Sequence, residues 1–177
     1  MIAGMAADPH EASRKHLLRD LRLGAFVKKH GPIMHRREHA PGAFQSLCES
    51  IIYQQLSGKA AGTILKRFIS LWPKKKFPTP DDVLKIQTEK LRTAGLSGQK
   101  ASYLKDLAAK FRDGTINPKL FHRMNDAEII GHVTAVKGIG EWTAQMFLMF
   151  TLARPDVLPT GDLGIQKGLQ KLFSLRA

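Results

Sequence analysis

Residues 133–144 read Val-Thr-Ala-Val-Lys-Gly-Ile-Gly-Glu-Trp-Thr-Ala, and this stretch decides how the rest of the chain is interpreted. A helical apolar pattern runs into Gly138-Ile139-Gly140, and a second one begins immediately after it. The glycines permit left-handed dihedrals and close approach of another molecule, while a new helix presents unpaired N–H groups. The stretch predicts either a helix–hairpin–helix that binds a phosphate at residues 138–142 or a tight connection ended by glycine. The inner face of the second helix is expected to carry Trp142, Met146, Met149, Phe150 and Ala153.

A second informative segment follows about twenty residues later, at 154–165. Prolines and Gly161 predict an extended strap, and apolar residues at helical spacing then predict a final helix with Asp162 at its start. An Asp at this place is favoured as an N-cap because its carboxylate accepts from free N–H groups and faces the positive end of the helix dipole.

The remaining chain is read as helix after short helix, which predicts an all-α fold. Apolar spacing predicts helices near 44–52, 61–72 and 101–114, and Thr79-Pro80-Asp81-Asp82 starts a further helix that runs to about Thr93. Asn125 and Glu128 resemble a capping box ahead of another helix. Before residue 43 the apolar residues predict one basic amphipathic helix; they are Leu17, Leu18, Leu21 and Phe26.

Composition restricts the class of partner. The 177 residues include 28 Lys and Arg against 15 Asp and Glu, a formal net charge of +13, yet 43% are hydrophobic, so the chain can bury a core. Such a charge favours a polyanion, with nucleic acid as the first choice and an acidic membrane surface as the second. The single cysteine, Cys48, excludes an internal disulfide, a cysteine zinc site and a four-thiolate iron–sulfur cluster. No apolar run is long enough for a membrane span or a secretory signal, which predicts an intracellular soluble protein.

Together, the hairpin at about 134–144, the Gly/Pro-rich strap and its Asp resemble the helix–hairpin–helix superfamily of DNA glycosylases. The likeness extends to residues 50–61 and 95–101, covers roughly 44–173, and is strongest to the alkylbase branch, DNA-3-methyladenine glycosylase II. It implies about eight to ten short helices in two lobes, with a basic N-terminal segment at 1–43 and a glycosylase domain at 44–177. The family normally continues with further helices after the last motif, so we expect this chain to lack them.

The resemblance implies hydrolysis of the N-glycosidic bond between an alkylated purine and deoxyribose, after the base has been flipped out of duplex DNA. Asp162 is then the catalytic carboxylate that stabilises positive charge on the sugar or orients water. Relatives that also cut the backbone carry a Lys two residues beyond the second hairpin glycine. Trp142 stands at that position here, which implies base excision without lyase activity.

The resemblance assigns further roles by position. The base pocket is expected to contain Trp142, Tyr53 and Met146. The wedge that fills the gap left by the flipped base is expected among Gln55, Gln54 and Leu56, with Gln55 slightly favoured. The DNA phosphates are expected to contact Lys137, Gly138, Gly140, Ser97 and Lys100. The resemblance implies no cofactor for catalysis. It implies a structural monovalent or divalent cation bound by the main-chain carbonyls of Thr134, Val136 and Ile139.

Two other functions stay open at this point. The chain could be a helix–hairpin–helix DNA-binding module that has lost turnover, or a glycosylase for oxidised or mismatched bases, which the absent Lys and cluster cysteines oppose. The expected partner is double-stranded DNA with alkylated bases, bound by a monomer and without a membrane. Such a protein would act in the nucleus of a eukaryote, which is favoured, or in the cytoplasm and nucleoid of a bacterium.

Overall fold

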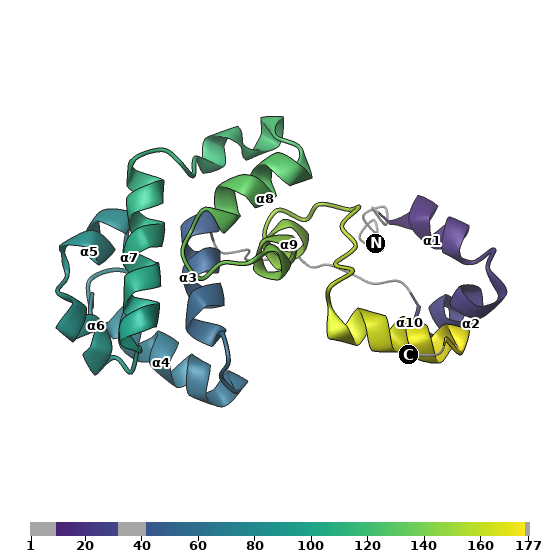
Figure 1. The fold of residues 1–177 in the computed structure, drawn as a ribbon, viewed down its shortest axis with the longest axis horizontal. Coiled ribbons are helices and arrows are strands. Elements are labelled where there is room, and N and C mark those ends of the chain that lie inside the picture. The colour runs from purple at the N-terminus through teal and green to yellow at the C-terminus, as the bar shows by residue number, and fades with distance from the viewer. Residues whose placement is uncertain (1–9, 32–41, 176–177) are drawn as a thin grey trace, which may run out of the picture. The chain divides into compact units, whose positions relative to one another are not determined.

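The computed structural model describes residues 10–31 and 42–175, and these contain ten α-helices, one 3-10 helix and no strand (Figure 1). The all-α prediction is confirmed. The chain divides into two compact units, residues 39–152 and residues 1–38 with 153–177, and each is described by itself. The sequence-based boundary at residue 43 stays a prediction, and most of the segment before it, residues 1–9 and 32–41, lies outside the described residues.

The larger unit is built around one long central helix. Its helices are α3 (Ala43–Tyr53), α4 (Gly58–Ser70), α5 (Pro80–Lys85), α6 (Thr88–Thr93), α7 (Gly98–Arg112), η1 (Pro118–Arg123), α8 (Asp126–Thr134) and α9 (Glu141–Phe150). α7 lies along both α3 and α5, while α8 and α9 pack as a pair (Figure 1). The 3-10 helix η1 lies in a stretch for which the sequence pattern predicted no helix.

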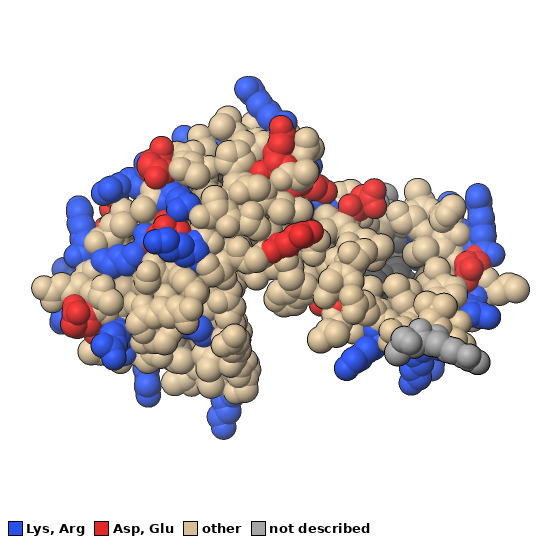
Figure 2. All heavy atoms as spheres, viewed as in Figure 1, with Lys and Arg blue, Asp and Glu red and all other residues tan. Residues whose placement is uncertain are grey.

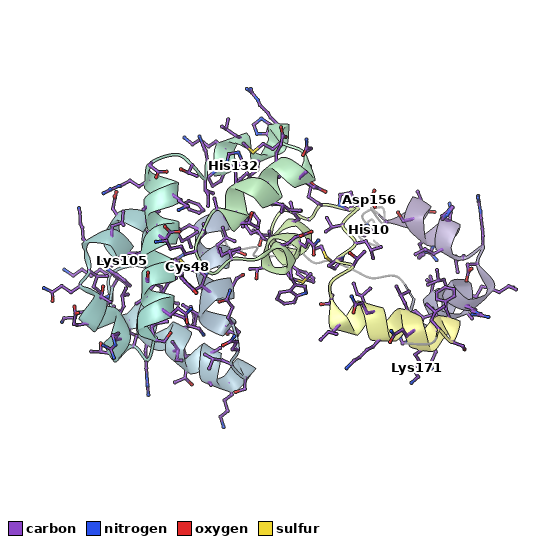
Figure 3. The ribbon with its side chains drawn as sticks, viewed as in Figure 1. His10, Cys48, Lys105, His132, Asp156 and Lys171 are labelled. Atoms are coloured by element: carbon purple, nitrogen blue, oxygen red, sulfur yellow. The ribbon has the colours of Figure 1, made fainter. Side chains whose placement is uncertain are left out.

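The core of this unit lies between α3 and α7. Both helices bury one face completely, and the fully buried side chains there are Leu47, Cys48, Ile51, Ile52, Ala101, Leu104, Leu107 and Ala108. Each large aliphatic side chain removed from water contributes about 1.5–3 kcal/mol to stability. Burial, with a smaller contribution from Glu49, raises the pKa of the Cys48 thiol well above its ordinary value. This cysteine is therefore a buried core residue that contributes to packing (Figure 3).

The predicted helix from Pro80 to Thr93 is two helices. α5 ends at Lys85, Ile86 has extended dihedrals, and α6 begins at Thr88. The reason comes from another part of the chain: the ammonium of Lys105 on α7 donates to the main-chain carbonyls of Leu84 and Ile86 (Figure 3). These bonds satisfy carbonyls at the end of α5 and allow the chain to leave the helix there.

Both predicted capping arrangements are confirmed. The backbone N–H of Asn125 donates to Glu128 Oε2 at 2.7 Å, and the N–H of Glu128 donates to Asn125 Oδ1 at 2.9 Å. Thr79 and Asp82 form the same reciprocal pair at the start of α5. The carboxylate of Asp82 also accepts two bonds from the Lys75 ammonium, at 2.6 and 2.7 Å.

Asp82 gives a stability prediction with a defined pH dependence. The hydrogen bond from Lys75, followed by that from the Thr79 N–H, lowers the pKa of Asp82 from 3.8 to about 2. A lowered carboxyl pKa stabilises the fold above the unfolded value, and this contribution is lost as the pH falls through the folded value. Asp82→Asn should therefore lower the free energy of unfolding by about 1 kcal/mol at neutral pH, with a difference that shrinks between about pH 4 and pH 2. Urea unfolding at several pH values measures this, and an effect of Asp82→Asn that does not change with pH would contradict it.

The second unit contains α1 (Glu11–Leu17), α2 (Leu21–His30) and α10 (Leu163–Phe173). The single amphipathic helix expected here is broken, because the carboxylate of Asp20 accepts from the N–H groups of Arg22 and Leu23 and starts a new helix. α2 and α10 are in contact, and the Arg22 guanidinium donates to the Phe173 carbonyl at 2.8 Å.

The inner face of α9 differs from the prediction. Its buried residues are Thr143, Ala144, Phe147 and Leu148, whereas the Trp142 and Phe150 side chains are 51% and 59% exposed. Seven of the ten residues of α9 are apolar and they lie all around the helix, so the periodicity could not select the face that packs on α8 and α3. Trp142 is therefore not a core residue.

Candidate functional site

The hairpin between α8 and α9, residues 135–140, presents its backbone to solvent. Val136 and Ile139 are 1% and 5% exposed and anchor it, while Lys137, Gly138 and Gly140 are exposed. Gly140 is the N-cap of α9, so the free N–H groups of the first turn and the positive end of the dipole are found at this surface. The arrangement can hold an anion through main-chain donors.

Gly138 is required for this conformation on two counts. Its φ is +80°, a region that side chains with a Cβ rarely adopt. A Cβ added at this position would also lie 2.1 Å from two ring carbons of Tyr103 on α7. The close approach of the Tyr103 ring therefore leaves room for glycine alone.

A carboxylate on α7 supports the hairpin. The backbone N–H of Lys137 donates to Asp106 Oδ2 at 2.8 Å, and the ammonium of Lys110 donates to both Asp106 oxygens at 2.9 and 3.0 Å. Burial works against ionisation of Asp106, but the bonds from Lys137 and Lys110 prevail and its pKa is lowered. The backbone at Lys137 is thus fixed while the residue itself is exposed.

The loop that follows α3, residues 54–57, lies beside this hairpin. The side-chain amide of Gln54 donates to the Gly138 carbonyl at 2.8 Å, which ties the two segments together. Gln55 is exposed and has a φ of +57°, and Leu56 is 39% exposed. Of the three predicted wedge residues, Gln54 is engaged with the hairpin, whereas Gln55 and Leu56 are turned toward solvent.

Two predicted phosphate contacts have structural partners of their own. The Ser97 hydroxyl accepts from the N–H of Lys100 at 3.1 Å and caps α7. The Lys100 ammonium donates to the main-chain carbonyls of Ile52 and Gln54, both at 2.8 Å. Burial lowers the pKa of this ammonium. Contact of either residue with a phosphate stays a prediction.

A hollow of about 450 Å³ lies between the loop, the hairpin and α7. It is lined by Gln54, Gln55, Ser97, Gln99, Lys100, Tyr103, Gly138, Trp142 and Thr143. The structure therefore brings Trp142 together with most of the predicted wedge and phosphate residues. It does not bring Tyr53 or Met146 to the hollow, although Tyr53 is 41% exposed nearby in sequence.

Asp162 begins α10, as predicted from its sequence context. Its Oδ1 accepts from the N–H of Ile165 at 3.0 Å, and its own N–H donates to the Pro159 carbonyl at 2.9 Å. The strap is further fixed by Gln166, whose side chain donates to the Thr160 carbonyl at 2.7 Å. Asp162 is partly exposed and belongs to the unit of residues 1–38 and 153–177.

The main chain at the end of α8 is compatible with the predicted cation. α8 ends at Thr134, and the Val136 carbonyl accepts one hydrogen bond, from Ile139 N–H at 3.1 Å, which leaves it a second lone pair. Oxygen donors of this kind suit hard cations. Within residues 10–31 and 42–175 no group of three acidic, His or Cys side chains could hold a metal, so a cation here would depend on carbonyls.

Tyr103 and Asp106 were not predicted as functional residues. Both lie on the α7 face that also carries Lys100, at intervals of three residues. The pattern shows only that Asp106 stands beside Leu104 and Leu107 of the apolar stripe, where an acidic side chain is favoured by a hydrogen-bonding partner. That partner, a backbone N–H 31 residues away, could not be identified from the pattern.

The geometry can be compared with known proteins. Residues 48–177 match the profile of the HhH-GPD superfamily base excision DNA repair proteins. The chain belongs to this family. A relative from Schizosaccharomyces pombe, DNA-3-methyladenine glycosylase 1, is 36% identical over 155 residues, covering 87% of this chain and 67% of the relative. The Saccharomyces cerevisiae DNA-3-methyladenine glycosylase is 40% identical over 138 residues, covering 74% of this chain and 47% of the relative.

Solved structures agree with this assignment. The structure of the S. pombe 3-methyladenine DNA glycosylase Mag1 in complex with abasic DNA has a TM-score of 0.81 and 33% identity, covering 94% of this chain and 82% of that one. A DNA-3-methyladenine glycosidase from Bacillus halodurans has a TM-score of 0.83 and 34% identity, covering 93% and 75%. This chain spans between about half and two thirds of the two curated yeast relatives.

Proposed function

We propose that this HhH-GPD protein is a monofunctional DNA glycosylase that removes alkylated purines from duplex DNA and leaves an abasic site. The observation that carries the proposal is Asp162 at the N-cap of α10, within the family match. The names of the relatives at 36% and 40% identity support the alkylbase branch. The carboxylate is the feature that a simple DNA-binding module has no need for, since it faces a polyanionic ligand.

DNA is held at the hairpin in this proposal. The N–H groups of Gly138 and Gly140 and the side chain of Lys137 bind one backbone phosphate, which positions the enzyme without reading sequence. Figure 2 shows Lys and Arg side chains scattered over the visible face with Asp and Glu among them. The net charge of +13 therefore attracts DNA through many dispersed cationic side chains. A hard cation on the carbonyls of residues 134, 136 and 139 would supply one more charge against that phosphate.

The reaction is hydrolysis at the anomeric carbon. The bond from C1′ to the purine nitrogen breaks, its electron pair leaves with the base, water adds to C1′ and a proton is released. Positive charge develops on the sugar as the base leaves, and the Asp162 carboxylate stabilises it. Placement at a helix N-terminus favours the ionised carboxylate, which suits electrostatic stabilisation or orientation of water better than strong general-base catalysis.

Trp142 distinguishes this reaction from that of the lyases. An indole cannot form the Schiff base that a Lys at this position forms with the sugar. Its 51% exposed side chain can instead stack on a flipped base, and its electron-rich face attracts a cationic methylated purine. We assign to Gln55 the role of filling the gap that the flipped base leaves in the stack, because the Gln54 side chain is hydrogen-bonded to the hairpin.

Base release and strand cleavage can be measured on the same substrate. The protein is incubated with a methylated duplex, and strands are analysed before and after alkali, beside an undamaged duplex. We expect alkali-labile sites in the methylated duplex only, above the rate without protein, and no nicks before alkali. Strand nicks that are present before alkali treatment would contradict the monofunctional assignment. Binding of DNA without any alkali-labile sites would identify a DNA-binding module.

The site of action follows the substrate. We expect the protein where cellular DNA is, in the nucleus of a eukaryote or with the nucleoid of a bacterium. No helix in the part of the chain that the structure describes is both long and apolar enough to cross a bilayer.

Gly164 allows a test that leaves the Asp162 carboxylate chemically intact. A Cβ on Gly164 would lie 2.9 Å from Asp162 Oδ1, so Gly164→Ala must displace the carboxylate that caps α10. We expect about tenfold slower base release, since small displacements of catalytic groups are costly. Gly168→Ala on the same helix, where a Cβ meets nothing within 4 Å, is the control. Equal rates for the two variants would show that the Asp162 position is not critical.

A further inference from the structure

We propose that Lys100 and Asp106 are positioning residues through which α7 fixes the two DNA-contacting segments, the wedge loop (residues 54–57) and the hairpin (residues 135–140). This inference rests on the proposed function, and it assigns to the two side chains a task that neither performs by touching DNA. Both charged groups bind main-chain atoms in these segments, so their effect on DNA is transmitted through the backbone.

The first link runs from α7 to the wedge loop. The Lys100 ammonium donates to the carbonyls of Ile52 and Gln54, the last residues before the chain turns at Gln55. α3 ends at Tyr53, so these carbonyls include groups that the helix leaves without partners. A cation at a helix C-terminus is also favoured by the dipole. Lys100 therefore fixes where α3 stops and the direction in which the wedge loop leaves it.

The second link runs from α7 to the hairpin. The Asp106 carboxylate accepts from the Lys137 N–H, and Lys110 neutralises its charge from one turn further along the same helix. The bond holds the residue immediately before Gly138, whose left-handed conformation makes the turn. Without Asp106, the Lys137 N–H would lose its partner, and the turn would lose its hydrogen bond to a charged carboxylate.

The two links are closed into a ring. The Gln54 side chain donates to the Gly138 carbonyl, and the Tyr103 ring packs on Gly138 from α7. Lys100, Tyr103 and Asp106 are spaced by three residues, so they lie along one face of the helix at intervals of about 4.5 Å. The wedge loop and the hairpin are thus bound both to α7 and to each other. Four members of this ring line the 450 Å³ hollow, namely Gln54, Lys100, Tyr103 and Gly138.

This ring of contacts orders the wedge loop and the hairpin before DNA binds. Loops that are ordered in the free protein lose less conformational entropy on binding, which increases affinity without any additional contact to the ligand. Asp106 does not act by binding DNA directly, because an acidic side chain beside a phosphate site would repel the phosphate. Its charge is instead engaged by Lys110 and by the Lys137 N–H.

The experiment compares Lys100→Met, Asp106→Ala and Asp106→Asn with wild type. Affinity is measured by fluorescence anisotropy with a duplex that carries a stable tetrahydrofuran abasic analogue, and amide hydrogen exchange is measured without DNA. We expect Lys100→Met and Asp106→Ala to bind about tenfold more weakly. Exchange should accelerate at residues 137–140 for Asp106→Ala and at residues 54–57 for Lys100→Met. Asp106→Asn, which keeps an oxygen acceptor, should recover most of the affinity.

Lys105→Met is the matched control. Lys105 lies on the same helix, its ammonium also donates to two backbone carbonyls, and burial also lowers its pKa, but these carbonyls belong to the α5–α6 junction. We expect a comparable loss of stability with unchanged DNA affinity. Equal weakening of DNA binding by Lys105→Met and Lys100→Met would overturn the proposal, as would unchanged loop exchange in the folded Asp106 and Lys100 variants. Wild type that shows protected loops but does not bind the duplex would contradict the proposed function alone.

Discussion

Asp162→Asn is expected to lower the rate of methylated-purine release by about 100-fold or more, since loss of one preorganised electrostatic contribution typically costs that much. Asparagine is nearly isosteric and caps helices about as well as aspartate, so α10 and the bond to Ile165 should persist. The variant removes only the negative charge that stabilises the sugar as the base leaves. Single-turnover release from a methylated duplex measures the effect, and thermal unfolding verifies that the fold is retained.

Asp156→Asn is the matched control for this prediction. Asp156 is an exposed aspartate in the same strap (Figure 3), six residues before Asp162, and it starts no helix. We expect its release rate to equal that of wild type. A similar loss in both variants would show that net charge in the strap matters and that Asp162 has no special role.

Gly138→Ala is expected to have the second large effect, on DNA affinity and on stability together. The left-handed φ of +80° disfavours any residue with a Cβ by about 1–2 kcal/mol. The Cβ would also overlap the Tyr103 ring, which must move and open the ring of contacts around the hairpin. We expect the free energy of unfolding to fall by about 2–4 kcal/mol and binding to an abasic duplex to weaken by about tenfold or more.

Gly131→Ala separates the hairpin effect from a general effect of replacing glycine. Gly131 lies inside α8, seven residues earlier, and a Cβ there would meet nothing within 4 Å. We expect it to raise stability by about 0.5–1 kcal/mol and to leave DNA affinity unchanged. If Gly138→Ala behaved in the same way, the hairpin conformation would not be needed for DNA binding.

Features that depend on a few neighbouring residues could be predicted from sequence. The capping boxes at Thr79 and Asn125 and the helix start at Asp162 are set by side chains that bond N–H groups within three residues. Their identity and spacing are therefore visible in the pattern itself.

Features that depend on distant partners could not be predicted. The break between α5 and α6 involves Lys105, about twenty residues away, and the exposed position of Trp142 follows from how α9 packs on α8 and α3. The supporting roles of Tyr103 and Asp106 require the hairpin to lie against α7, which is a fact of tertiary structure. The hairpin and the position of Asp162 at the start of α10 were therefore predictable, whereas the α7 residues that bind the hairpin and the loop after α3 were not.

Chromatographic identification of the bases freed from one methylated duplex shows whether this chain excises alkylated bases by means of Asp162. Wild type and Asp162→Asn are each used in excess over DNA, next to a reaction without protein. We expect free methylated purine from wild type, and release by Asp162→Asn close to the spontaneous rate despite equal binding to an abasic duplex. Equal release by both proteins, or none from wild type above the spontaneous rate, would contradict it.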